Sequence, residues 1–269
     1  PTGEARITIS APMPGNILSV NVKPGDKVEK GTLVATPTGL GANIFSSVYG
    51  TVEEVTDQAI VIQPDDEQPD RYIPIKKSDS KLEMVKEAGI VGMGGAGFPT
   101  GVKLGADLQG GYILVNAAEC EPGLKHNIMQ LEQQAEKTVR GVEYCMEMSN
   151  AKKAIFAIKR KNARAISAIK KAIADKPDIS IHLLPDIYPM GEERAVVREC
   201  LGILLEPTQL PSAAHANVVN CETVLRVAEA IEDQKPCIYK NISVVGKVHG
   251  GPEAQVFMDM PVGISVEDI

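Results

Sequence analysis

The chain has 269 residues, 43% of them hydrophobic and 23% charged, which is enough for one large or two modest domains with real cores. A net charge of −7, no Trp and only 4 Phe and 6 Tyr argue against nucleic-acid binding, because that function needs a basic groove and aromatic stacking platforms. No run approaches the roughly 20 apolar residues of a membrane span, and the amino terminus lacks the basic-then-apolar order of a signal peptide. Five widely spread cysteines are typical of reduced thiols, so we expect a cytoplasmic protein, with docking at the inner face of the membrane left open.

Residues 1–76 have the pattern of an all-β domain. The phrases Gly15–Val20 and Gly50–Val55 each place a Gly before an alternating strand, which predicts two half-motifs in a small sandwich. The Lys23–Val28 turn resembles that of the biotinyl/lipoyl hammerhead, which implies a barrel-sandwich hybrid. No Lys lies between Gly31 and Gly50, where such carriers hold their modified Lys, so neither prosthetic group is expected.

Residues 80–235 alternate between helical and extended patterns, which predicts a mainly parallel sheet with covered faces and hence a Rossmann-like α/β domain. Ser80–Glu83 is a capping box that opens a short helix, and Gly89 is placed to close it. Strands are predicted at 112–116, 154–158 and 179–184, and helices at 130–148, 163–174, 191–201 and 217–231.

Residues 240–269 change character again. The stretches 242–248 and 254–258 flank the turn His249-Gly250-Gly251-Pro252 and predict a hairpin, and Ser265–Asp268 has the pattern of a capped helix start. A lone hairpin is marginally stable, so we expect the chain to be part of a longer protein.

Six glycines fall in the thirteen residues from Gly89 to Gly101. Their backbone N–H groups are unshielded by side chains, and successive exposed N–H groups make a concavity suited to phosphate. Lys103 adds a mobile positive charge just beyond the loop. The loop is therefore a candidate site for a phosphorylated ligand.

Two other interpretations of this loop stay open. Gly92, Gly94 and Gly97 with Glu119 match the dinucleotide-binding fingerprint, but that motif needs a strand before it and a helix within it. Here a capped helix precedes the loop and Phe98-Pro99 interrupts it, which disfavours a standard NAD site. A glycine-rich turn that only permits tight packing is the third interpretation.

Four segments with recognisable wording follow one another along the chain, namely Gly92–Lys103, Val115–Pro122, Tyr188–Ala195 and Val218–Thr223. In this order they resemble segments of the flavoprotein subunit of respiratory complex I and of the C subunit of Rnf electron-transport complexes. The resemblance extends over nearly the whole chain, because Ile44–Val52 in the β region is similar to the Rnf subunit and the tail resembles the opening of a soluble-ligand-binding β-grasp domain.

The resemblance implies a site for FMN, with residues from all four segments and no metal ligands. Gly92, Gly94, Gly95 and Gly97 would hold the phosphate and ring edge, and Lys103 and Asn116 the ring or ribityl chain. Gly191, Glu192 and Glu193 would line the flavin or nicotinamide face, and Asn220 and Thr223 would bind phosphate at a helix start. Glu119 and Glu121, which follow a strand where α/β ligands usually bind, complete the expected site residues. The tail would open a truncated soluble-ligand-binding β-grasp (SLBB) domain.

The sequence departs from the complex I pattern in ways that affect NADH more than flavin. Met93 stands where that family has Arg, Ala118 replaces an acid, and Leu104–Ala106 replaces an aromatic stack for NADH. NADH is therefore expected only as a candidate substrate. No catalytic residue is identifiable.

The chain has no Cys-x-x-Cys, so iron–sulfur clusters are expected only outside it. The expected function is an FMN-binding electron-transfer subunit that works with other redox subunits, with the electron-transfer protein of proline reductase as a close variant. The alternative is a docking and assembly module with a vestigial flavin pocket. Glu192 and Glu193 also fit a purely structural role, because acids are favoured at a helix start.

Overall fold

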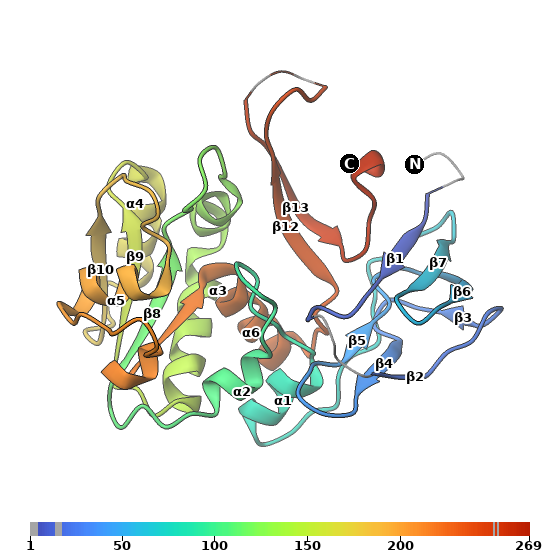
Figure 1. Cartoon of the computed structure of the whole chain (residues 1–269), viewed down its shortest axis with the longest axis horizontal. Helices are drawn as coiled ribbons and strands as arrows, with labels where there is room; N and C mark the ends of the chain where they lie inside the picture. The colour runs from blue at the N-terminus through green and yellow to red at the C-terminus, as the bar shows by residue number, and fades with distance from the viewer. Residues whose placement is uncertain (1–4, 14–17, 250, 252) are drawn as a thin grey trace. The chain divides into compact units, whose positions relative to one another are not determined.

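The computed structural model describes residues 5–13, 18–249, 251 and 253–269. The predicted residues Gly15–Ile17, Gly250 and Pro252 lie outside these ranges. The chain divides into two compact units (Figure 1): residues 1–101, 229–240 and 259–269 form the first, and residues 102–228 and 241–258 the second. This division differs from the predicted domains 1–76, 80–235 and 240–269, which stay a prediction.

The β region of the first unit contains two antiparallel sheets. One sheet has the order β1-β7-β6-β3 and the other the order β2-β4-β5. Their apolar side chains, among them Ile9, Val34 and Ile62, form one buried cluster. The strands are β1 (Ile7–Ile9), β2 (Leu18–Val20), β3 (Lys27–Val28), β4 (Leu33–Pro37), β5 (Ile44–Phe45), β6 (Gly50–Val55) and β7 (Ile60–Pro64).

The predicted capping box is present at the start of α1 (Lys81–Glu87). The Ser80 hydroxyl accepts a hydrogen bond from the Glu83 N–H at 3.2 Å. Gly89 follows the helix with φ +67°, a conformation that favours glycine, so its predicted role at the helix end is confirmed. A short second helix, α2 (Thr100–Leu104), begins directly after Pro99.

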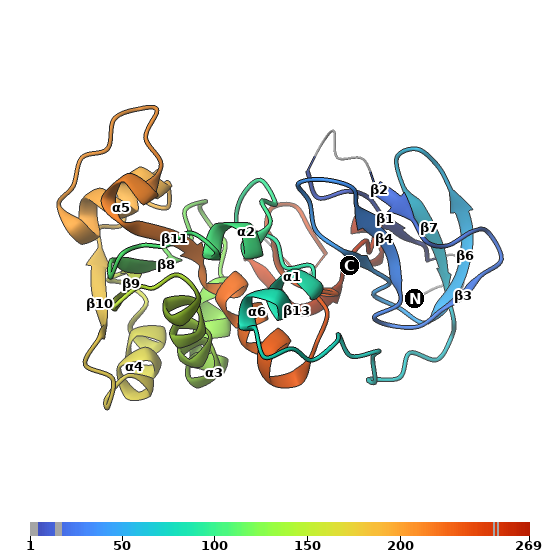
Figure 2. The same ribbon diagram turned by 90° about the horizontal axis from the view of Figure 1, so that it is seen from below.

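A four-stranded parallel sheet forms the centre of the second unit, in the order β10-β9-β8-β11. The helices α3 and α4 pack together on one face and α5 covers the other (Figure 2). The strands are β8 (Tyr112–Ala117), β9 (Lys153–Lys159), β10 (Ile179–Leu184) and β11 (Ala216–Asn220). The helices are α3 (His126–Met148), α4 (Ala163–Ala172), α5 (Glu193–Leu201) and α6 (Cys221–Asp233), with a 3₁₀ turn at Pro211–Ala214.

The prediction of one helix over 217–231 is wrong in its first turn. Residues 216–220 form β11, which pairs with β8 so that Val218 lies opposite Leu114. The β-branched residues Val218 and Val219 are buried in this strand. Their backbone groups pair with β8, a segment about 100 residues earlier, so the sequence around 216–220 alone does not show that a strand forms there. The helix α6 begins only at Cys221.

The helix predicted at 130–148 begins four residues earlier, at His126, and Gln134 inside it has non-helical angles. The side chains that start it come from elsewhere in the unit. The Ser243 hydroxyl accepts from the N–H groups of Lys125 and His126 at 3.0 and 3.1 Å, and a Glu119 carboxylate oxygen accepts from Asn127 N–H.

The predicted hairpin is present as a two-stranded sheet of β12 (Tyr239–Val244) and β13 (Gln255–Pro261), but its first strand begins and ends earlier than the predicted 242–248. The helix start predicted at Ser265 is only a 3₁₀ turn over Val266–Asp268. Its Ser265 hydroxyl donates to the Asp268 carboxylate rather than accepting a backbone N–H.

Candidate functional site

The carboxyl edge of the parallel sheet gathers most of the predicted site residues of the second unit. β8 is flanked by β9, which follows it in sequence, and by β11, which comes much later, so the strand order reverses there. Ligands of open α/β sheets bind outside the carboxyl ends of the strands at such a reversal. The segments that leave this edge are 118–125, 159–162 and 185–193.

Asn116 and Gly191 are brought together by a direct hydrogen bond. The Asn116 amide donates to the Gly191 carbonyl at 2.9 Å, and its carbonyl oxygen accepts from Ala118 N–H at 3.1 Å. A Cβ on residue 191 would lie 2.7 Å from the Cys120 Cβ, so only glycine permits this approach. Two predicted segments are thereby held against each other.

Lys103 and Glu193 form an ion pair, with Nζ 2.7 Å from Oε1. Both side chains are partly exposed, and the Lys103 carbonyl accepts from the Asn217 amide at 3.0 Å. The structure thus places two predicted flavin-binding residues, 90 positions apart in sequence, at one point.

Glu192 caps α5. One of its carboxylate oxygens accepts from Ala195 N–H and the other from the Arg194 side chain, both at 3.1 Å. Burial opposes the charged form, but the hydrogen bonds from Arg194 and from Ala195 N–H outweigh it, so the pKa of Glu192 is lowered from its ordinary value. This carboxylate stays ionised beside the predicted site.

Glu119, two residues beyond the end of β8, adopts a positive φ of 43°. Its carbonyl accepts from Lys159 Nζ at 3.3 Å, and the same ammonium lies 3.3 Å from the Asp186 carboxylate. The Lys159 side chain is only 7% exposed, so it ties the loop after β8 to the loop after β10. Sequence reasoning missed Lys159 and Asp186. The available signal for Lys159 was a Lys at the carboxyl end of a buried strand.

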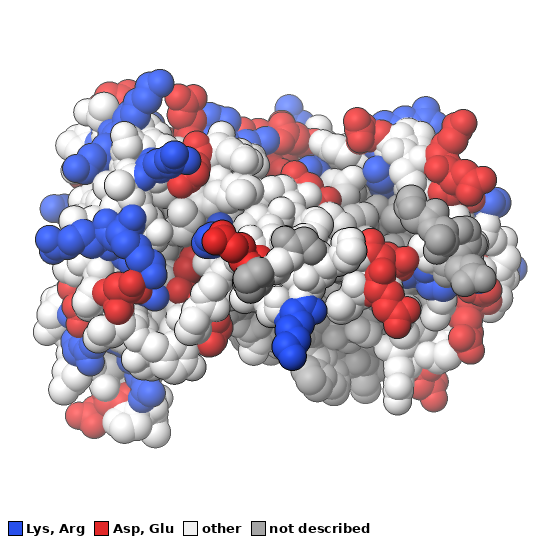
Figure 3. All heavy atoms as spheres, turned by 90° about the horizontal axis from the view of Figure 1, so that it is seen from above, with Lys and Arg blue, Asp and Glu red and all other residues white. Residues whose placement is uncertain are grey.

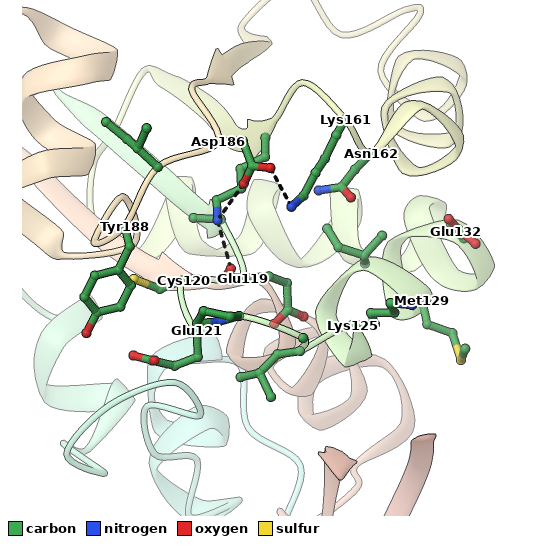
Figure 4. A pocket seen from close by; sticks show the side chains of 17 residues that line it. Glu119, Cys120, Glu121, Lys125, Met129, Glu132, Lys161, Asn162, Asp186 and Tyr188 are labelled. Atoms are coloured by element: carbon green, nitrogen blue, oxygen red, sulfur yellow. Dashed lines mark hydrogen bonds and ion pairs between the residues drawn. The ribbon is translucent and has the colours of Figure 1, made fainter. Parts of the chain in front are cut away.

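A cavity of about 630 Å³ opens between these loops (Figure 4). Its size is in the range of small-molecule sites. Glu119 and Glu121 line it, together with the ion pairs of Asp186. The remaining walls are Ala118, Cys120, Pro122, Gly123, Leu124, Lys125, Ile128, Met129, Glu132, Lys159, Lys161, Asn162, Ile187 and Tyr188.

Asn220 and Thr223 lie at the start of α6, where the sequence placed them. The Asn220 carbonyl oxygen accepts from Glu222 N–H at 2.8 Å, so this side chain already caps the helix. Thr223 is only 1% exposed. Glu222 is fully buried and pairs with Arg226 at 3.1 Å. The helix start is thus largely satisfied by the chain itself.

The glycine loop belongs to the first unit and is described there by itself. A bridge between Val91 and Pro99 closes it, and Gly92 N–H donates to the Phe98 carbonyl at 2.9 Å. Its tip, residues 94–96, is exposed, and a Cβ on Gly95 would meet nothing within 4 Å. Gly97 is buried at φ +72°, where a Cβ would lie 2.9 Å from the Pro12 carbonyl oxygen. The loop is therefore anchored at its base and open at its tip.

Two absences bear on the site. Among the residues that the structure describes, no three His, Cys, Asp or Glu side chains are grouped to hold a metal ion. No helix in those same ranges is long and apolar enough to cross a membrane.

Comparison with known proteins places these features in a family. A model of the Nuo51 FMN-binding domain (Complex1_51K) matches residues 85–229, more than half of the chain. Cobalamin reductase PduS of Salmonella typhimurium is 38% identical over 192 residues, which are 71% of this chain and 41% of that protein. The C subunit of the proton-translocating ferredoxin:NAD(+) oxidoreductase complex of Clostridium ljungdahlii is 34% identical over 245 residues, 84% of this chain and 53% of that one.

The chain spans about half the length of these curated relatives or less. Among solved structures, an NAD+-reducing [NiFe]-hydrogenase in the H2-reduced state matches with a TM-score of 0.55 at 24% identity, over 67% of this chain and 37% of that one. At that identity the likeness shows a shared fold.

Proposed function

Because the chain belongs to the family of the Nuo51 FMN-binding domain, we propose that it is the flavin-bearing part of an electron-transfer subunit in a larger redox complex. The resemblance inferred from the four sequence segments is confirmed by the family match and by the Rnf-type C subunits among the relatives. The observation that carries the proposal is the family match together with the anchored, open glycine loop that lies inside it.

The residues of the first unit fit FMN at the glycine loop. The exposed tip and the empty space at Gly95 leave backbone amides accessible, as an incoming phosphate or ring edge requires. We assign Gly92, Gly94, Gly95 and Gly97 to this role, as the sequence resemblance implied.

In the second unit, Asn116 and Gly191 are assigned to the ribityl chain or ring and Lys103 and Glu193 to the ring edge. The hydrogen bond from the Asn116 amide to the Gly191 carbonyl orders the end of β8 and the segment before α5 before any ligand binds, which lowers the entropic cost of binding. Glu119, Glu121 and Glu192 border the same edge. Asn220 and Thr223 remain assigned to the phosphate, although both make contacts within α6.

FMN, when bound, accepts an electron pair as hydride and releases electrons singly. NADH or a reduced carrier is the proposed donor, and iron–sulfur centres in other parts of the complex are the proposed acceptors. The replacement of the aromatic NADH stack by Leu104–Ala106 favours a reduced carrier over NADH.

Finer features of the fold and setting belong to the same proposal. We assign the all-β region to a barrel-sandwich hybrid, the parallel sheet to a Rossmann-like layout and the hairpin after α6 to the opening of an SLBB domain. We also propose that the subunit works in the cytoplasm, peripheral at the inner face of the cell membrane. A role beside proline reductase is the variant within this proposal.

A specific observation favours a second candidate, an assembly module with a vestigial pocket. Lys103 is already paired with Glu193, and Asn220 with Glu222 N–H, so two predicted ligand contacts are made within the chain. The two candidates differ in whether FMN binds.

The test is titration of the purified chain with FMN, followed by addition of NADH. The proposal predicts a stoichiometric yellow complex with bands near those of free flavin. Bleaching by NADH would support NADH as the donor, and bleaching only by dithionite would exclude NADH and leave a reduced carrier as the proposed donor. Absence of FMN binding by a folded chain would favour the assembly module.

A further inference from the structure

Positive charge is segregated into one short stretch of an otherwise acidic chain. Residues 149–174 contain eight of the 28 Lys and Arg residues and no Asp or Glu. They form β9 and α4, at one end of the second unit. Figure 3 shows Lys and Arg side chains gathered over the end that carries α4 and β10.

The charges fall into two groups at opposite ends of α4. Lys170 and Lys171 lie in its last turn, where the helix macrodipole favours cations. That placement is explained by the stability of the helix. These two residues therefore make a matched control for the other group.

The group at the start of α4 has the opposite electrostatics. Arg160 and Lys161 precede the helix and Arg164 lies in its first turn, where the macrodipole already makes the surroundings positive. The first turn contains no acid, and Asn162 makes no side-chain cap. Helix stability does not account for cations at this position.

Only one of the three cations in this group is neutralised by an ion pair within the described ranges. Lys161 lies 2.7 Å from the Asp186 carboxylate. Arg160 and Arg164 are exposed, and neither forms an ion pair with any residue that the structure describes. Two exposed guanidinium groups are therefore left for an outside anion.

Two of these cations, Arg160 and Lys161, border an apolar groove. A cavity of about 540 Å³ is lined by Arg160, Lys161, Asp186, Leu183, Leu184 and Pro185. Large apolar side chains stand exposed at the same end of β10, namely Leu183 at 39%, Ile187 at 56% and Tyr188 at 63%. An apolar centre with a charged rim is the anatomy of a protein interface.

We propose that the basic-rimmed groove lined by Arg160, Lys161 and Leu183, together with the exposed side chains of Arg164, Ile187 and Tyr188 beside it in the chain, docks an acidic electron-carrier protein. That the partner is acidic follows from the unpaired guanidinium groups, and that it is a protein follows from the apolar floor. That it carries electrons rests on the proposed function, since Ile187 and Tyr188 also line the cavity that contains Glu119 and Glu121, two residues assigned to the proposed flavin site.

The test measures binding of the whole chain to a small acidic ferredoxin as the probe, at low and at high salt. We expect the double substitution R160Q/R164Q to weaken binding about tenfold or more at low salt and to flatten the salt dependence, because complementary rim charges govern steered association. The control K170Q/K171Q removes the same charge from the other end of the same helix and should change binding less than about twofold. Ile187→Ser should weaken binding at both salt concentrations.

Equal weakening by both double substitutions, or no binding of ferredoxin, would overturn the proposal. So would vesicles of anionic lipid that bind through Arg160 and Arg164 while ferredoxin does not. FMN affinity is measured in the same preparations. A chain that binds ferredoxin through this groove but takes up no FMN would contradict the proposed function while supporting the docking surface.

Discussion

At the scale of single residues, Gly95 offers the most direct test of the proposal that the glycine loop binds FMN. Because a Cβ there meets nothing within 4 Å, Gly95→Val should leave the fold and melting temperature unchanged. A branched side chain would shield the backbone that FMN must approach, so we expect FMN affinity to fall about 100-fold or more. Isothermal titration measures it. Gly39→Val, at a site with equally open space in the same unit, is the control and should bind normally. Unchanged FMN affinity in Gly95→Val would remove the loop from the site.

A substitution at Gly191 tests whether FMN binding depends on the close approach of this residue to Cys120. Gly191→Ala brings a methyl group to 2.7 Å from the Cys120 Cβ, so the segments must separate. We expect a loss of about 1–3 kcal/mol in the free energy of unfolding, as for overpacked interiors, and weaker FMN binding. Urea denaturation and flavin titration measure the two effects.

The double substitution Gly191→Ala with Cys120→Gly removes the clashing Cβ. It should recover most of the FMN affinity lost in the single variant. A double variant that binds no better than Gly191→Ala would show that the close approach of residues 120 and 191 is not what matters at this position.

At the scale of elements, the start of α5 depends on ionised Glu192. Its pKa is lower in the folded chain than the ordinary value of 4.5. A lowered folded pKa means that the stabilisation is complete above the unfolded value and is lost as pH falls through the folded value. Glu192→Gln should therefore cost about 1 kcal/mol at neutral pH, as for a lost helix cap, and progressively less in acid.

The measurement is urea unfolding of both proteins between about pH 7 and pH 3, a range that spans the titration of a carboxyl group. Glu199→Gln, near the end of the same helix, is the matched control, and it should show no comparable cost at neutral pH. A stability difference at Glu192 that stays constant down to the acid end of this range would contradict the assignment of the cap to the carboxylate.

The helices α1 and α3 also show when local sequence signals are sufficient to predict where a helix begins or ends. Ser80–Glu83 and Gly89 predicted both ends of α1 because capping involves groups only a few residues apart. The predicted start of α3 was wrong by four residues because its first N–H groups are satisfied by Ser243 and Glu119. Ser243 comes from a distant segment and Glu119 from the loop before the helix. The helical periodicity of 130–148 therefore gives no indication that these side chains extend the helix to His126.

At the scale of the whole molecule, we expect this chain to bind FMN but no iron–sulfur cluster. The five cysteines are scattered in sequence, and the described residues contain no cluster suited to a metal. Cluster ligation takes four closely grouped thiolates. We expect the chain loaded with FMN to contain no stoichiometric iron or sulfide and to reduce single-electron acceptors less efficiently than a longer form that carries cluster motifs. Iron at one equivalent or more per chain would refute this.

The sequence by itself determined the family and most of the secondary structure, and it supplied the prediction of the flavin loop. These rest on contiguous motifs such as Gly92–Lys103 and on periodic patterns such as 154–158 and 179–184, whose physics is local. The short strand β11 escaped prediction because its partner β8 comes much earlier in the sequence. Tertiary structure alone decided that Asn116 holds Gly191, that Lys103 meets Glu193, and that buried Lys159 ties the loops after β8 and β10 together. Each of these contacts joins segments far apart in the sequence, and their energies depend on burial and distance that only the folded chain sets.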